Sequence, residues 1–179
     1  WPVVHAVIDK WGNTPEWAQY AGPGHWNDPD QLMIGLKNGQ ITEIEGETQM
    51  AIWAIVAAPL FMSNDLRKLE PWAKTLLQNK EVIAVDQDKA GIAGIRMTPK
   101  GENKQVWLRQ LSDGHYAVAL FNAGETATDI SFSFSDLKLP KNTYNLRDLF
   151  KHADLGQVTG SYTGTTIPPQ GVLFLRFKP

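Results

Sequence analysis

The chain has 179 residues, a formal net charge of −2 and no cysteine. The lack of cysteine excludes disulfides, a thiol nucleophile and a cysteine-based zinc site. The near-neutral charge gives no support for binding nucleic acid or an anionic membrane, and the sequence has no run of about 18 apolar residues that would predict a membrane span. The length is sufficient for one or two domains with their own cores.

The first segment, residues 1–11, reads WPVVHAVIDKW. Its apolar residues recur at the spacing of an amphipathic helix, and Pro2 suits the first turn. His5 and Asp9 lie one turn apart on the other face, where a solvated pair is favoured over a functional site. Gly12 and Pro15 predict the end of this helix.

Residues 20–35, YAGPGHWNDPDQLMIG, form what we call the acidic loop. Pro29 disfavours the helical region for Asp28, so we expect a short parallel strand that ends at Asp28-Pro29-Asp30. Asp28 and Asp30 would then point to one side, about 6.5 Å apart, beside Trp26. Carboxylates that accept from hydroxyls and a ring that stacks on a pyranose indicate a sugar site. An Asx-rich turn with a buried tryptophan remains the alternative.

Residues 42–71 predict a helix, a strand and a second helix. Thr42 and Glu45 have the spacing of a capping box, and the helix should run to about Ala57. It should bury Ile44, Met50, Trp53, Ala54 and Ala57. Pro59 breaks it, residues 60–63 (LFMS) resemble a buried parallel strand, and another helix should begin near Pro71. This is α/β order, and in β/α barrels the site lies at the carboxyl ends of the strands.

The second half of the chain, from about residue 92, changes to the alternating pattern of strands. Strands are expected at residues 104–111, 115–122, 126–135, 142–150 and 171–177. Asp113-Gly114 predicts a tight hairpin, and this spacing of strands is typical of an antiparallel sandwich. Ile130, Phe132 and Phe134 should form the inner face of one strand. Trp107 and Tyr162 are interpreted as core residues in preference to sugar platforms.

Two motifs carry a family resemblance. GPGHWNDPDQL in the acidic loop, followed by TEIEGETQMAIWAIVAAPLFMSNDLR at residues 42–67, resembles glycoside hydrolase family 27. These are the retaining α-galactosidases and α-N-acetylgalactosaminidases of the melibiase type. The resemblance implies that residues 1–91 are the last two β/α units of a (β/α)8 barrel. It implies that residues 92–179 are the C-terminal antiparallel β-sandwich.

The same resemblance implies roles for residues of the acidic loop. The position that matches Asp30 hydrogen-bonds a sugar hydroxyl, and the next position, often Met in relatives but Gln31 here, lines the pocket. Asp28 should hold the loop by accepting from backbone N–H groups. We therefore predict substrate binding by Trp26, Asp28, Asp30 and Gln31.

No catalytic residue is expected in this chain. In the resembled family the nucleophile and the acid/base are carboxylates upstream of the segment that matches Trp1. The parent enzyme is expected to remove terminal α-linked galactose-type sugars, whereas this chain alone would be an inactive fragment. It should pair with the missing N-terminal part of the barrel or with a second copy. A non-catalytic β-sandwich module that binds carbohydrate, or packs on another domain, is the alternative.

Neither a metal nor a cofactor is expected. The four histidines lack metal-ligand spacing, and no glycine-rich phosphate loop opens a helix. The absence of cysteine and of Asn-x-Ser/Thr sites favours a bacterial origin, because animal members of the resembled family carry cysteines and glycans. The compartment stays open between secreted, periplasmic and cytoplasmic.

Overall fold

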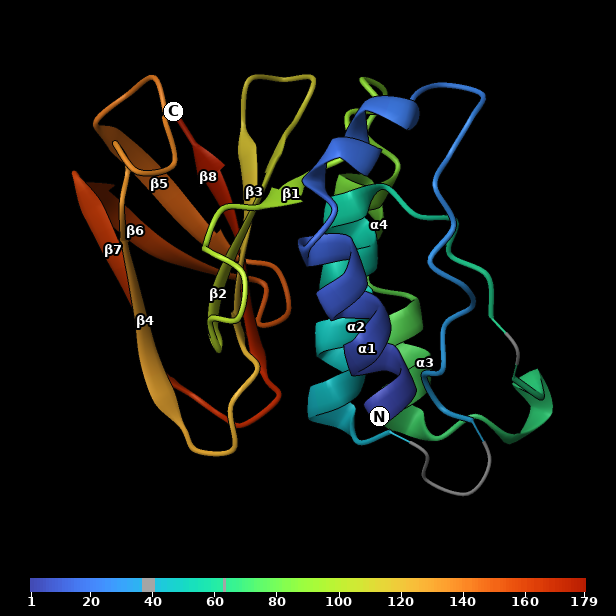
Figure 1. Cartoon of the computed structure of the whole chain (residues 1–179). Coiled ribbons are helices and arrows are strands. Elements are labelled where there is room, and N and C mark those ends of the chain that lie inside the picture. The colour runs from blue at the N-terminus through green and yellow to red at the C-terminus, as the bar shows by residue number, and fades with distance from the viewer. Residues whose placement is uncertain (37–40, 63) are drawn as a thin grey trace.

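The fold, in a computed structural model, is described for residues 1–36, 41–62 and 64–179. Helices form one half of the molecule and a β-sandwich forms the other, with the acidic loop running along the outer side of the helices (Figure 1). A barrel end followed by a C-terminal sandwich is the fold class that the sequence predicts. The domain boundary at residues 91 and 92 stays a prediction.

The first helix, α1 (Pro2–Gly12), confirms the amphipathic pattern of residues 1–11. It buries Val4 and Ile8 against the core, and His5 Nε2 lies 3.8 Å from Asp9 Oδ2 on the more exposed face. A short 3-10 helix, η1 (Pro15–Tyr20), follows and leads into the acidic loop.

The central helix is α2 (Glu43–Val56), and its capping box forms as predicted. Thr42 Oγ1 accepts from the Glu45 amide at 3.3 Å, and Glu45 Oε2 accepts from the Thr42 amide at 2.7 Å. The helix is buried nearly all round, because the acidic loop packs on one side and the sandwich on the other. Ile44 is an exception to the predicted buried set: it is 40% exposed, because its turn borders a cavity between helix and sandwich.

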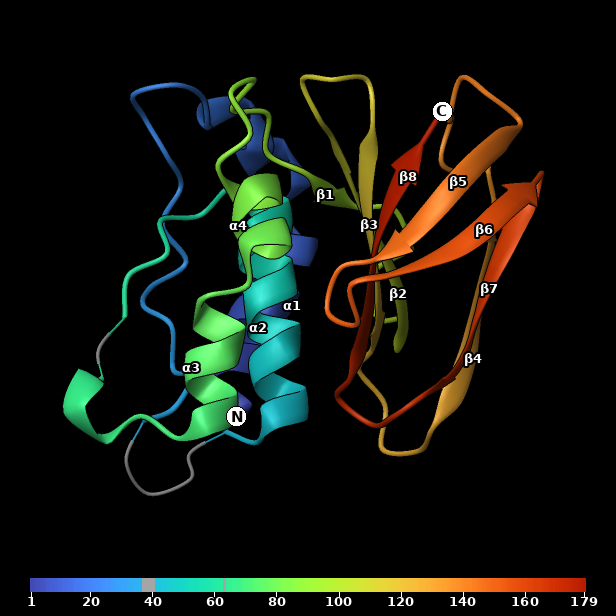
Figure 2. The same cartoon turned by 180° about the vertical axis from the view of Figure 1, so that it is seen from behind.

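The predicted helix near Pro71 is α3 (Pro71–Leu77), which lies beside α2 (Figure 2). A 3-10 turn, η2 (Leu66–Lys68), precedes it, and α4 (Lys80–Asp86) follows it. The Asn79 side chain caps α4 by accepting from the amides of Glu81 and Val82. Its Nδ2 donates to the Leu149 carbonyl at 2.9 Å, so this cap also joins the helical half to the sandwich.

The two expected parallel strands are reduced to one bridge between Leu32 and Met62. The strand predicted to end at Asp28-Pro29-Asp30 does not form, because residues 26–31 pair with no neighbouring strand, although the chain does turn at Asp30, where φ is 82°. The segment at residues 60–62 is only partly buried: Leu60 packs against the core, whereas Phe61 is 67% and Met62 45% exposed. Among the described residues, the segment around Leu32 and residues 60–62 pair only with each other. A parallel strand is normally covered on both faces, and this single pairing does not provide that cover. Ser63, the last residue of that expected strand, lies outside the described residues.

The sandwich contains a six-stranded antiparallel sheet in the order β1-β2-β3-β8-β5-β6 and a two-stranded sheet of β4 and β7. The strands are β1 (Ile95–Arg96), β2 (Lys104–Gln110), β3 (Tyr116–Asn122), β4 (Thr128–Ser133), β5 (Thr143–Asp148), β6 (Ala153–Thr159), β7 (Ser161–Ile167) and β8 (Val172–Lys178). The Asp113-Gly114 hairpin forms between β2 and β3, with Gly114 at a φ of 81°. The five predicted strands are confirmed, whereas β1, β6 and β7 were not predicted from the sequence.

Two cores flank the six-stranded sheet. One lies between α2 and the sheet, and the other lies between the two sheets and contains Ile130, Phe132 and Phe134, as predicted. Strand β3 serves both, because alternate residues along it face opposite cores. Trp107 is fully buried in the first core, and Tyr162 packs against the second, so the core interpretation of both is confirmed.

Candidate functional site

Two buried residues of α2 fix the main chain of the acidic loop. Trp53 Nε1 donates to the Asp30 carbonyl at 2.8 Å. Gln49 donates to the Gln31 carbonyl at 3.2 Å and accepts from the Met33 amide at 2.8 Å. Gln49 has no exposed surface and Trp53 is 2% exposed. The backbone at Asp30 and Gln31 is therefore anchored from below, while both side chains remain exposed.

The two aspartates of the loop build a turn. Asp28 Oδ1 accepts from the Asp30 amide at 2.8 Å, and Asp30 Oδ1 accepts from the Gln31 amide at 2.6 Å. The side chain of Asp28 thus offers the backbone an alternative to a strand ladder. The predicted role of Asp28 in holding the loop is confirmed, and Asn27 adds a bond of 2.7 Å from Nδ2 to the Trp17 carbonyl. The expected side-by-side pair of carboxylates on an extended strand is wrong.

The Leu32–Met62 bridge joins the acidic loop to the segment that follows α2. The bridge is parallel, so the chain leaves both segments at the same edge. Ile34 follows Leu32 and Asn64 follows Met62, so these two residues lie on the carboxyl side of the bridge, whereas Asp30 and Gln31 precede it. The Asn64 amide donates to the Ile34 carbonyl across this edge.

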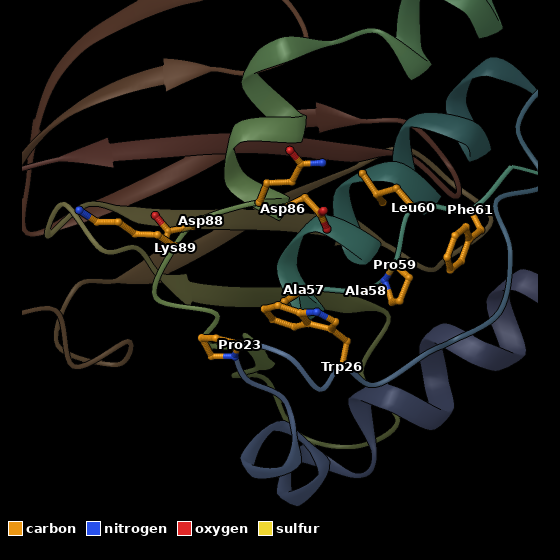
Figure 3. A pocket seen from close by; sticks show the side chains of 11 residues that line it. Pro23, Trp26, Ala57, Ala58, Pro59, Leu60, Phe61, Asp86, Asp88 and Lys89 are labelled. Atoms are coloured by element: carbon orange, nitrogen blue, oxygen red, sulfur yellow. The ribbon is translucent and has the colours of Figure 1, made fainter.

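A pocket of about 410 Å³ lies between the Gly-Pro-Gly turn and the C-terminal ends of α2 and α4 (Figure 3). Its lining residues are Pro23, Trp26, Ala57, Ala58, Pro59, Leu60, Phe61, Asp86, Gln87, Asp88 and Lys89. Trp26, which is 44% exposed, belongs to this pocket, whereas Asp28, Asp30 and Gln31 are not part of its lining. Hydrogen bonds therefore join Asp28, Asp30 and Gln31 in one turn, and Trp26 lines a pocket to which these three do not contribute.

Asp86 is a chemically distinct residue of this pocket that sequence reasoning missed. Burial raises the pKa of Asp86 to about 7, against the opposing effect of the nearby Arg109 charge. Asp86 Oδ1 is buried and has no hydrogen-bond partner among the described residues. The guanidinium of Arg109, 1% exposed, donates from Nη1 to the Asp86 carbonyl at 3.1 Å. An aspartate in the last turn of a helix, where the dipole disfavours negative charge, was the available signal.

Two further kinds of site find no support in the part of the chain that the structure describes. No group of three or more histidine, aspartate or glutamate side chains gathers there as a metal-binding set. Likewise, none of the described helices has both the length and the apolar character needed to cross a membrane.

The chain matches two known family models. The model described as "Alpha galactosidase A" matches residues 1–88, and that of the "Alpha galactosidase C-terminal beta sandwich domain" matches residues 101–177. Human alpha-galactosidase A is 45% identical over 142 residues, which is 79% of this chain and 32% of that protein. Chicken alpha-N-acetylgalactosaminidase is 38% identical over 186 residues, which is 100% of this chain and 45% of that protein.

Solved structures agree with these matches. A family 27 β-L-arabinopyranosidase from Geobacillus stearothermophilus superposes with a TM-score of 0.87 at 28% identity, covering 100% of this chain and 42% of that one. Alpha-galactosidase I from Mortierella vinacea gives a TM-score of 0.82 at 33% identity, covering 89% of this chain and 41% of that one. The chain thus spans less than half the length of these relatives.

Proposed function

The chain belongs to glycoside hydrolase family 27, and from that premise we propose that its parent enzyme removes terminal α-linked galactose-type sugars with retention of configuration. The observation that carries the proposal is the anchored acidic loop, in which α2 holds the backbone of Asp30 and Gln31 while both side chains remain exposed. The curated relatives are named as α-galactosidases and an α-N-acetylgalactosaminidase. The alternative of a free-standing sandwich module does not account for the match of residues 1–88.

We assign binding, and not catalysis, to the residues of the loop. A retaining glycosidase uses two carboxylates about 5–5.5 Å apart, one as nucleophile and one as acid/base. Asp28 and Asp30 lie on a single turn and so flank the same side of a substrate. Asp30 is proposed to accept from a sugar hydroxyl, Gln31 to add a hydrogen bond, and Asp28 to hold the turn. The nucleophile and acid/base are expected upstream of this chain.

Of the four proposed binding residues, Trp26 has the least structural support. Its ring lines the pocket beside the Gly-Pro-Gly turn, to which Asp30 does not contribute. The proposal covers galactose-type sugars as a class, because one solved relative is a β-L-arabinopyranosidase. We also propose a bacterial origin, and this proposal rests on the lack of cysteine. The curated relatives themselves span human, chicken, plant and bacterial proteins.

The role of Asp30 is tested by Asp30→Asn in the complete enzyme. Loss of one charge-assisted hydrogen bond should lower kcat/KM by roughly 10- to 150-fold, equivalent to about 1.5–3 kcal/mol. Asp154→Asn, a matched change on the exposed strand β6, should leave kcat/KM unaltered. Complete loss of turnover in Asp30→Asn, restored by azide, would show that Asp30 is catalytic and the binding role wrong.

The reaction class is tested separately by following product configuration with proton NMR. Retention predicts that the α-anomer of the released sugar appears first and then equilibrates to the mixture. Initial release of the β-anomer would mean inversion and would contradict the proposed mechanism. Because the readout is stereochemical, it does not depend on the outcome for Asp30.

A further inference from the structure

A second cavity, of about 420 Å³, lies where the first turns of α2 meet the sandwich. We call it the junction cavity. Its lining residues are Ile44, Glu47, Asp148, Phe150, Lys151, Leu155, Tyr162, Thr165, Thr166, Ile167, Pro168, Gly171, Val172 and Leu173. Glu47 and Gln49 are two residues apart on α2 and so point about 160° away from each other. The junction cavity therefore faces away from the acidic loop.

The walls of the junction cavity are fixed without a ligand. Thr48, which has no exposed surface, donates from Oγ1 to the Gln170 carbonyl at 2.7 Å and joins α2 to the chain that enters β8. Asp148, 2% exposed, accepts from the amides of Phe150 and Lys151 at 3.0 Å each. A preformed cavity of this size is within the usual range of small-molecule sites.

The lining combines hydroxyl groups, one available carboxyl group and apolar side chains. Burial, with Glu43 and Asp148 nearby, raises the pKa of Glu47 to about 7, and Lys151 opposes this shift. Asp148 is already engaged by its own turn, so Glu47 is the carboxyl group left to meet a ligand. Tyr162 keeps its ring in the second core, with its ring centroid 6.3 Å from that of Phe132.

This chemistry matches a neutral polyhydroxylated ligand. A cation would need fixed negative charge, but Glu47 is only partly ionised near neutral pH and Lys151 stands in the same lining. An anion would meet the carboxyl groups of Glu47 and Asp148. Sugar hydroxyls both donate and accept, and the apolar face of a pyranose suits the Phe150 and Leu173 side chains.

We propose that the junction cavity is a non-catalytic binding site for one pyranose unit of a carbohydrate, with Glu47 accepting from a sugar hydroxyl. This site is separate from the acidic loop and does not rest on the proposed hydrolysis. It gives the sandwich and α2 a shared function, because neither lines the cavity alone.

The test measures sugar binding to the 179-residue chain by calorimetry and saturation-transfer NMR. The probes are methyl α-D-galactopyranoside and methyl α-D-mannopyranoside, at concentrations up to about 50 mM, since weak sugar sites bind in the millimolar range. Glu47→Gln keeps the shape of the side chain and should weaken binding about tenfold at pH 8. Glu43→Gln, one turn away and outside the lining, is the matched control and should bind as the unaltered chain does at pH 8, where Glu47 is ionised in both chains.

Two further readouts separate a ligand contact from a structural effect. Binding to the unaltered chain should strengthen between pH 6 and 8, because an ionised Glu47 is the better acceptor, and Glu47→Gln should abolish this dependence. The charged groups beside Glu47 are Glu43, Asp148 and Lys151. Tyr162→Phe keeps the core packing, removes the hydroxyl and should weaken binding a few-fold, with thermal unfolding confirming the fold of each variant.

The outcomes are decisive in both directions. Loss of binding in Glu47→Gln with retention in Glu43→Gln supports the site. The proposal is overturned if neither probe binds, or if Glu47→Gln and Glu43→Gln bind the probes equally well. Binding that is lost in Asp30→Asn but kept in Glu47→Gln places the sugar at the acidic loop and also overturns the proposal.

Discussion

Asp86 ends α4 with a carboxyl group that burial holds in its neutral form up to about pH 7. In the unfolded chain an aspartate loses its proton near pH 4. The folded state therefore binds more protons than the unfolded state between these values, and the free energy of unfolding falls as pH rises from 4 to 7. Asp86→Asn removes this loss. We expect the variant to gain about 1–2 kcal/mol over the unaltered chain across that range, after allowance for partial solvation.

The measurement is urea unfolding at a series of pH values. Glu16→Gln, at an exposed position of η1, is the control and should keep the pH dependence of the unaltered chain. A gain for Asp86→Asn that does not vary between pH 4 and 7 would contradict the assignment, because a titrating carboxyl group must produce a slope.

For individual residues, the sequence predicts the hydrogen-bonding role of a side chain better than the conformation of the backbone. The hydrogen-bonding function of Asp28 followed from its residue type, but the positive φ of Asp30 did not, because two local side-chain bonds decide it. The place of Trp26 in a pocket without Asp30 could not be predicted either. It depends on where α2 and α4 end, not on the spacing of Trp26 and Asp30 along the chain.

The helices show the effect of local capping. Thr42 supplies one half of the capping box of α2, the helix that anchors the acidic loop. Thr42→Ala removes the side-chain acceptor for the Glu45 amide and should cost about 1 kcal/mol, or roughly 2–4 °C in Tm. Thr75→Ala is the matched control, since Thr75 is exposed within α3 and donates only to the Pro71 carbonyl. Equal losses in the two variants would show that the capping box contributes nothing specific.

Among whole elements, those with a local signal were predictable. Pro2, the capping box at Thr42 and Pro71 mark the starts of α1, α2 and α3, and the alternation in residues 126–135 marks β4. Strands β6 (ADLGQVT) and β7 (SYTGTTI) carry glycine and many polar residues, so their periodicity is weak. Their pairing partners β5 and β4 decide their structure, and such long-range pairing leaves little local pattern.

Across the whole molecule, exposed apolar side chains gather on the helical half. Tyr20, Trp26, Phe61, Met62 and Leu66 are between 44% and 67% exposed, and all come from the acidic loop region and the segment after α2. The side of the helical half that faces the six-stranded sheet is, in contrast, covered by the sandwich. We propose that the exposed side receives the N-terminal part of the barrel, or a second copy of this chain where that part is absent.

This proposal predicts that the isolated chain associates with itself. Sedimentation velocity over a range of concentrations should show a shift from monomer to larger species, because exposed apolar surface drives association. The double substitution Phe61→Ser and Met62→Ser should reduce this shift, whereas Leu155→Ser, at a 42% exposed position on β6, should leave it unchanged. Adding the N-terminal part of the barrel in trans should compete with self-association. A monodisperse monomer that unfolds cooperatively at every concentration would contradict the proposal, because the exposed strand segments would then be stable without a partner.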